Sequence, residues 1–118
     1  MLSAQTQSSA ERKQRLKQEL ARYVRILTTR GNPERVIVFG SLATGHVHTW
    51  SDIDLVIIEQ TDLPFLERLH RMRDLLQPQV GTDFLVYTPQ EFEQLCQTHS
   101  FFCTEIMTKG IVVYERTG

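Results

Sequence analysis

The chain has 118 residues, of which 41% are hydrophobic and 23% are charged, and its formal net charge is −1. This length fits one small globular domain with a modest core. The balanced charge gives no electrostatic footprint for direct binding of nucleic acid, so a small substrate or a protein partner is favoured. We expect the Gln- and Ser-rich residues 1–9 to be disordered and residues 10–118 to form a single domain.

Cysteine usage and apolar runs indicate the cellular setting. Cys96 and Cys103 lie in apolar segments without a C-x-x-C spacing, so buried free thiols are expected rather than a disulfide or a metal site. Free thiols would suit a reducing, cytoplasmic location. The first nine residues lack the apolar stretch of a signal peptide, and no apolar run approaches the roughly 20 residues of a membrane helix. The pattern predicts a soluble protein.

A first helix is predicted from about Ser8 to a stop at Gly31-Asn32-Pro33. Ser8 and Glu11 match a capping box, and Gly31 is expected to supply a left-handed helix end. Apolar residues recur at helical spacing, namely Leu16, Leu20, Tyr23, Val24 and Leu27. The basic cluster on its first turns is interpreted as a solvated face rather than a nucleic-acid patch; it comprises Arg12, Lys13, Arg15 and Lys17.

The stretch from Arg35 to Glu59 predicts a strand, a glycine-containing loop and a second strand that opens with two aspartates. Side chains alternate along a strand, so Asp52 and Asp54 point the same way and can converge on one cation. Oxygen ligands favour a hard divalent ion such as Mg²⁺. Gly40 permits a close backbone approach, and Ser41 offers a hydroxyl and an N–H to phosphate. The ordinary alternative is a β-turn-β unit with solvated strand-end aspartates.

The loop between these strands holds three ambiguous side chains. His46 and His48 could contact a phosphate or a metal, but loop histidines are more often merely exposed. No cysteine or third histidine stands at ligand spacing beside them. Trp50 could stack on a base or anchor the loop, and anchoring is favoured just before a buried strand.

A crossover helix is predicted next, capped by Asp62, with Pro64 in its first turn and an end at Gln77-Pro78. Its apolar face comprises Phe65, Leu66, Leu69, Met72 and Leu76. Its arginines are interpreted as solvated rather than phosphate-binding; they are Arg68, Arg71 and Arg73. Thr82 to Tyr87 predicts a third strand, in which Asp83 is the only acidic residue.

The last quarter of the chain predicts two helices and an edge strand. Thr88 and Glu91 form a second capping box with Pro89 at the first helical position. A short helix then runs to Gly110, and Ile111 to Tyr114 predicts a closing strand. Strands alternating with helices place the protein in the α/β class.

Gly40-Ser41, ten intervening residues and Asp52-Ile53-Asp54 together resemble the signature of minimal nucleotidyltransferases of the DNA polymerase beta superfamily. The order of elements from Arg35 to Tyr87 is similar too. The resemblance implies a small mixed sheet flanked by helices, with an acidic cluster at one end. It also implies that Asp83 is the third carboxylate that joins Asp52 and Asp54 in holding metal. Many members carry Arg directly after Gly-Ser, where this chain has Leu42, so the triphosphate contact is missing or supplied elsewhere.

The same resemblance implies a mechanism. An acceptor hydroxyl attacks the α-phosphorus of ATP with the help of two Mg²⁺ ions, and pyrophosphate leaves. Asp52 and Asp54 would serve both ions, Asp83 would serve chiefly the attacking side, and Gly40 and Ser41 would hold the β and γ phosphates.

Minimal members similar to this chain work beside a helical HEPN-type protein, which implies an antitoxin that transfers AMP to a tyrosine of a HEPN ribonuclease. An apolar face of the helix at Phe92–Cys96 or at Phe102–Met107 would dock this partner. The alternatives are a catalytically silent binding antitoxin, a nucleotide-binding subunit of a larger transferase, and a small-molecule (antibiotic) nucleotidyltransferase. Three retained carboxylates argue against silence, because a buried acidic cluster is costly without a cation.

Overall fold

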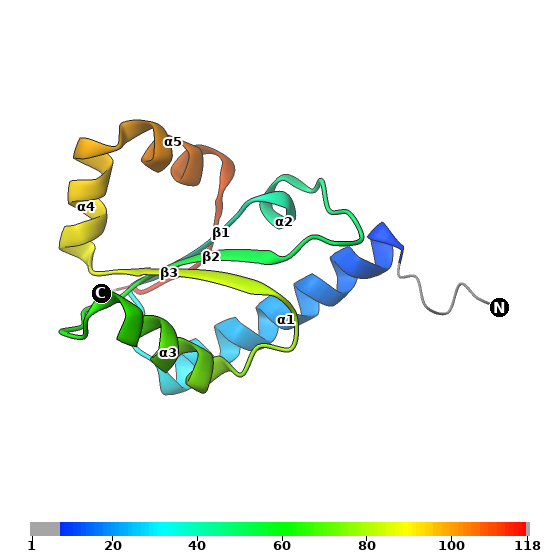
Figure 1. Ribbon diagram of the computed structural model, residues 1–118, viewed down its shortest axis with the longest axis horizontal. Helices are drawn as coiled ribbons and strands as arrows, with labels where there is room; N and C mark the ends of the chain where they lie inside the picture. The colour runs from blue at the N-terminus through cyan, green and yellow to red at the C-terminus, as the bar shows by residue number, and fades with distance from the viewer. Residues whose placement is uncertain (1–7, 118) are drawn as a thin grey trace.

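The computed structural model describes residues 8–117 as a mixed four-stranded sheet with helices on both faces (Figure 1). The elements in chain order are α1 (Ser9–Arg30), β1 (Arg35–Phe39), α2 (Ser41–Thr44), β2 (Ile53–Ile58), α3 (Phe65–Leu76), β3 (Thr82–Tyr87), α4 (Pro89–Thr98), α5 (Ser100–Lys109) and β4 (Ile111–Glu115). The strand order is β3-β2-β1-β4, in which β2 and β3 are parallel and the other neighbours are antiparallel. The α/β class and the mixed sheet are confirmed.

Helix α1 begins as its capping box predicts. The Ser8 hydroxyl accepts from the Glu11 N–H at 3.1 Å, and the Glu11 carboxylate accepts from the Ser8 N–H at 3.0 Å. Residues 1–7 of the predicted disordered start lie outside the described residues, whereas Ser8 and Ser9 belong to the cap and first turn. The left-handed end predicted at Gly31 is wrong. Gly31 is extended, with φ −103° and ψ −167°, and the chain leads straight toward Pro33, which disfavours helical backbone just before it.

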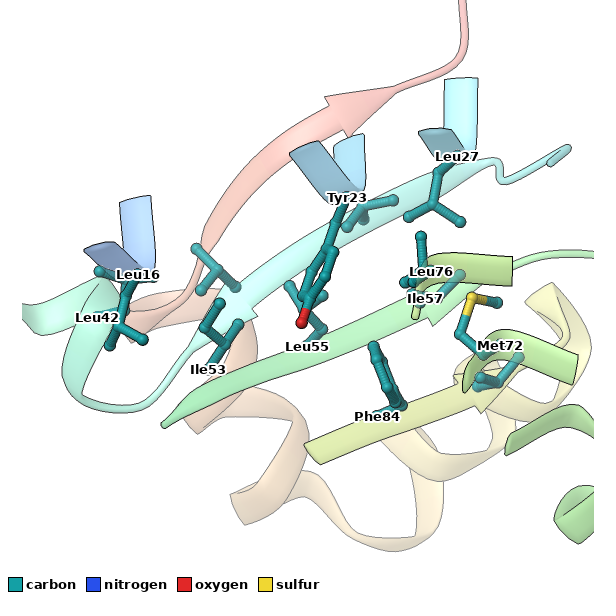
Figure 2. Close-up of a cluster of buried hydrophobic side chains, with 13 residues drawn as sticks. Leu16, Tyr23, Leu27, Leu42, Ile53, Leu55, Ile57, Met72, Leu76 and Phe84 are labelled. Carbon is teal, nitrogen blue, oxygen red and sulfur yellow. The ribbon is translucent and has the colours of Figure 1, made fainter. Parts of the chain in front are cut away.

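One face of the sheet carries the main core, which α1 and α3 cover (Figure 2). Alternation along β2 points Ile53, Leu55 and Ile57 to this side. The helices add Leu16, Tyr23, Leu27, Met72 and Leu76, and Leu42 from α2 packs into the same cluster. This burial fixes which face each residue of β2 and β3 occupies, and therefore sends Asp54 and Asp83 to the opposite face.

Helices α4 and α5 form a hairpin over that opposite face (Figure 1). A smaller core lies beneath them and consists of Ile37, Val56, Ile58, Phe92 and Ile106. The capping box of Thr88 and Glu91 is present as predicted. Strand β4 pairs only with β1 and is an edge strand, also as predicted.

The cysteine prediction is wrong. Cys96 on α4 and Cys103 on α5 form a disulfide, because the sharp reversal between the two helices brings their Cα atoms to 4.9 Å. The inference of a reducing setting therefore loses its basis. Within residues 8–117, no helix has the length and apolar character needed to cross a membrane.

The start of α3 differs from the prediction. The cap position is occupied by Pro64, not Asp62, and no side chain caps the helix, because Pro64 with ψ 157° leads directly into Phe65. Arg68 is not solvated as predicted: its side chain donates to the carbonyls of Leu63 and Val86 and pairs with Glu91 at 2.6 Å.

The other two arginines of α3 remain exposed, and each has a neighbour in the fold. Arg71 pairs with the buried Glu59 at 2.8 Å. The Arg73 guanidinium lies 5.8 Å from the centre of the Phe84 ring.

Candidate functional site

Two carboxylates lie side by side where β2 and β3 begin. Asp54 and Asp83 are each the second residue of their strand, and the parallel register pairs them directly. The antiparallel register places Asp54 opposite Phe39, the last residue of β1. Neighbouring strands are about 4.8 Å apart, so these carboxylates are close enough to share a cation. The structure thus brings together two of the three predicted metal ligands.

Asp52 is the residue just before β2 and is the third carboxylate of the acidic cluster. The Ile53 N–H donates to the Gly81 carbonyl at 3.0 Å, so pairing with the β3 side begins before the strands themselves. The Asp52 carboxylate lies directly over Gly81, where an added Cβ would stand 2.5 Å from Oδ1. Gly81 therefore leaves the space that Asp52 occupies. Sequence reasoning did not single out this glycine.

Gly40 contacts Asp54 through its backbone. Its φ of 72° and ψ of −154° are open to glycine and strained for any other residue, and an added Cβ would overlap Asp54 Oδ2. The Gly40 carbonyl accepts from the N–H groups of Ala43 and Thr44, both at 3.1 Å. Ser41, half-buried, begins α2 directly after Gly40. The Gly-Ser pair and the carboxylate pair therefore belong to one site.

The carboxylates of the cluster repel one another because they lie close together. The pKa of Asp54 is raised from its usual 3.8 to about 6, first by burial and then by the carboxylates of Asp83 and Asp52. Asp52 and Asp83 themselves are exposed. A divalent cation would relieve this repulsion and lower the pKa of Asp54 again.

Arg12 of α1 also reaches the site. Its Nε donates to the Ser51 carbonyl at 2.9 Å, and its Nη2 lies 3.5 Å from Asp52 Oδ1. Within residues 8–117, no three His, Cys, Asp or Glu side chains converge closely enough to ligate one ion as they stand. Asp52 instead has a cationic neighbour. The prediction that Arg12 is merely solvated is wrong, because α1 continues past the sheet alongside the segment that joins α2 to β2 (Figure 1).

Helix α1 further fixes the segment that leads into Asp83. The Tyr23 hydroxyl is 2.7 Å from Thr82 Oγ1, and burial raises the pKa of Tyr23 to about 12. The buried Glu19 carboxylate accepts from the Gln79 N–H at 2.6 Å. These two contacts hold β3 in the register that places Asp83 beside Asp54.

The 40–52 loop, defined as residues 40–52, is held by a serine side chain rather than by its aromatic residue. Trp50 is 85% exposed, so the prediction that it anchors the loop is wrong. The buried Ser51 does so instead, since its hydroxyl accepts from the His48 N–H at 2.9 Å. His46 and His48 are exposed, and His48 Nδ1 accepts from the Trp50 N–H at 3.3 Å.

Comparison with known proteins is consistent with this geometry. The family profile described as "Polymerase beta, Nucleotidyltransferase" matches residues 21–117. A crystal structure of a "putative nucleotidyltransferase" from Sulfolobus solfataricus has a TM-score of 0.66 at 18% identity, covering 93% of this chain and 89% of that one. No curated protein sequence matches the chain significantly.

Two further structures of similar fold come from toxin-antitoxin systems. One is a toxin-antitoxin structure with AMP-PNP, with a TM-score of 0.54 at 18% identity over 82% of this chain and 73% of that one. The other is a mutant of the toxin-antitoxin MntA-HpeT, with a TM-score of 0.51 at 17% identity over 83% and 73%. At these identities the likeness concerns the fold.

Proposed function

Since the match over residues 21–117 shows that the chain belongs to the polymerase beta nucleotidyltransferase family, we propose that it transfers AMP from ATP to a hydroxyl acceptor with Mg²⁺ as cofactor. The observation that carries this proposal is the pairing of Asp54 with Asp83 beside the positive-φ Gly40. Two carboxylates and a positive-φ turn thus lie at one end of the sheet, which supports a catalytic carboxylate pair beside a phosphate-binding backbone.

The residues present fit a hard divalent cation. All donors are carboxylate oxygens, which Mg²⁺ prefers, and burial beside like charges already raises the pKa of Asp54. Asp52, Asp54 and Asp83 form the proposed ligand set for two Mg²⁺ ions. Asp52 completes it when its carboxylate turns from Arg12 toward Asp54, two residues further along the chain.

The proposed reaction is an in-line displacement at phosphorus. The acceptor oxygen forms a bond to the α-phosphorus, the bond from that phosphorus to the oxygen bridging the α and β phosphates breaks, and pyrophosphate leaves. Mg²⁺, when bound, supplies charge neutralisation and lowers the pKa of the acceptor hydroxyl. Asp83 is the proposed base that takes the acceptor proton, and its exposure supports this role. Gly40 and Ser41 hold the β and γ phosphates through their backbone and hydroxyl groups.

The proposed acceptor is a tyrosine of a HEPN-type toxin ribonuclease, which AMP transfer would silence. Toxin-antitoxin structures that share this fold support a toxin partner. Of the two helix faces expected to dock it, α4 has its Phe92 buried, whereas α5 exposes Phe101 and Met107. Exposed apolar residues continue into β4. Its first residue, Ile111, pairs with Val38 of β1, and the next residue of β1, Phe39, pairs with Asp54. Ile111 therefore lies at the same end of the sheet as the carboxylates, whereas Met107 contacts Arg35 at the opposite end.

The test is to incubate the protein with a candidate HEPN-type partner, ATP and Mg²⁺, and to weigh the partner by intact mass spectrometry. One or more added AMP units, lost with Asp52→Asn, are expected. An unmodified partner that still binds tightly and is inhibited would instead identify a catalytically silent antitoxin. Efficient transfer to an aminoglycoside with an unmodified partner would identify a small-molecule transferase.

A further inference from the structure

The side chain after the Gly-Ser pair does not face the carboxylates in this fold. Leu42 is 7% exposed and belongs to the main core, where it lies next to Leu16 of α1 (Figure 2). A side chain at this position therefore points into the apolar layer and away from the carboxylates. Residues 40–52 contain no Lys or Arg, so a Lys or Arg side chain that faces a triphosphate there has to come from another element.

Two consecutive basic residues on α1 approach this loop. Arg12 contacts Ser51 and Asp52 at the end where β2 begins. Lys13 approaches the other part of the loop, where its Nζ stands 3.8 Å from the position that a Cβ on Gly45 would take. The first turns of α1 thus bring two cations to the loop that joins the Gly-Ser pair to the aspartates.

The Arg12 side chain is held in place with donors to spare. It is 17% exposed, its Nε is tied to the Ser51 carbonyl, and its Nη2 contact to Asp52 is long at 3.5 Å. Within residues 8–117, Nη1 has no hydrogen-bond acceptor, and Lys13 is in no ion pair. A guanidinium anchored through Nε presents its remaining N–H groups as a fork suited to phosphate oxygens.

The negative charge at the site favours a contribution from the cations of Arg12 and Lys13. A nucleoside triphosphate carries several negative charges and would lie beside three carboxylates, so like charges would oppose its binding unless cations surround it. We propose that Arg12 and Lys13 together bind the triphosphate of the nucleotide and supply the positive charge that the buried Leu42 does not. This inference rests on the proposed function and deepens it. When Arg12 turns to phosphate, it also releases Asp52 toward the other two carboxylates.

The test measures binding of two probes, ATP and inorganic tripolyphosphate, each with Mg²⁺, by titration calorimetry. The variants are Arg12→Met and Lys13→Met, with Lys17→Met as matched control. Lys17 lies on the same helix but lines a separate groove with Leu20 and Val24, so its loss removes the same charge elsewhere. Arg12→Met and Lys13→Met are each expected to lower the affinity for both probes about tenfold, which corresponds to about 1.4 kcal/mol of binding free energy. Lys17→Met is expected to leave both affinities unchanged.

Further readouts separate binding from folding. Melting temperatures without ligand report any loss of fold, and Lys13→Met carries the test if Arg12→Met unfolds. Lys13→Arg, which keeps the charge, is expected to restore most of the affinity for tripolyphosphate. Wild-type binding with unchanged affinities in both variants would overturn this inference alone. A wild-type protein that binds neither probe would overturn the proposed function with it.

Discussion

The two ends of the β2–β3 pair differ in whether their charged side chains have partners of opposite charge. At the carboxyl ends, the buried Glu59 pairs with Arg71 at 2.8 Å, and Arg68, 8% exposed, pairs with Glu91 at 2.6 Å. At the amino ends, Asp54 faces other carboxylates, and Arg12 lies 3.5 Å from Asp52. Burying a charge is tolerated when a counterion accompanies it. The paired end therefore stabilises the fold, whereas the like charges of the acidic end oppose it.

The largest expected effect is on transfer at the acidic end. Asp54→Asn keeps the volume of the side chain and removes the charge of a proposed metal ligand, so the proposed AMP transfer should fall by about a thousandfold or more. Asp83→Asn should behave in the same way. The rate is measured by mass spectrometry of the modified partner, with Asp74→Asn on the exposed side of α3 as the control. Near wild-type transfer by the Asp54 variant would remove this residue from the metal site.

At the paired end the expected effect is on stability. Arg68→Met abolishes the pair with Glu91 and leaves the carbonyls of Leu63 and Val86 without their donor. We expect a loss of about 3 kcal/mol in the free energy of unfolding, measured in urea, with unchanged affinity for ATP below the melting temperature. Arg73→Met, an exposed change on the same helix, should cost under about 1 kcal/mol. Equal losses from the two arginines would contradict the structural role of Arg68.

A glycine comparison tests how closely the backbone approaches the acidic end. Gly40→Ala combines a positive φ with an overlap on Asp54, whereas Gly45→Ala has a positive φ and only Lys13 Nζ nearby, at 3.8 Å. The cost should be about 1 kcal/mol for Gly45→Ala and about 2 kcal/mol or more for Gly40→Ala. Thermal unfolding of both variants measures the difference. Indistinguishable melting temperatures would mean that Gly40 does not touch Asp54.

The smallest effect is a pH dependence of the metal-free protein. The folded pKa of Asp54, about 6, lies above its usual 3.8, so its contribution to stability is full below pH 3.8 and is lost as pH rises through 6. Asp54→Asn removes this dependence. Relative to wild type, the variant should therefore gain about 1 kcal/mol between pH 5 and pH 7, a figure discounted because the carboxyl keeps contact with solvent. Chemical denaturation at the two pH values measures the gain, and a constant difference would rule out the raised pKa.

Sequence patterns among neighbouring residues predicted many of the helix ends and strand faces that position the site. The capping boxes at Ser8 and Thr88, and the period-two alternation that places Asp54 opposite the core, depend on neighbouring residues and are therefore visible in the sequence. The sequence also predicted a close backbone approach at Gly40, and the structure adds its positive φ. The fold class was predictable because the alternation of strands and helices is also a local pattern.

Long-range contacts account for what the sequence did not reveal. Arg12 meets Asp52 across 40 positions of the chain, and Arg68 meets Glu91 across 23, so neither pairing leaves a local signal. The disulfide between Cys96 and Cys103 depends on how sharply α4 turns into α5, which spacing alone does not determine. The prediction for Trp50 was wrong because the Ser51 hydroxyl, which accepts from the His48 N–H, can hold the loop without an aromatic anchor.

The most direct test of the acidic end as a ligand site is the melting temperature of wild type and Asp54→Asn, each with and without Mg²⁺ and ATP. Without ligand, Asp54→Asn should melt at or above the wild-type temperature, because one repelling charge is gone. With ligand at about a hundredfold excess over Kd, wild type should gain about 2.7 kcal/mol and the variant far less, so their order reverses. A variant that melts below wild type without ligand and gains as much from Mg²⁺ and ATP would contradict the account.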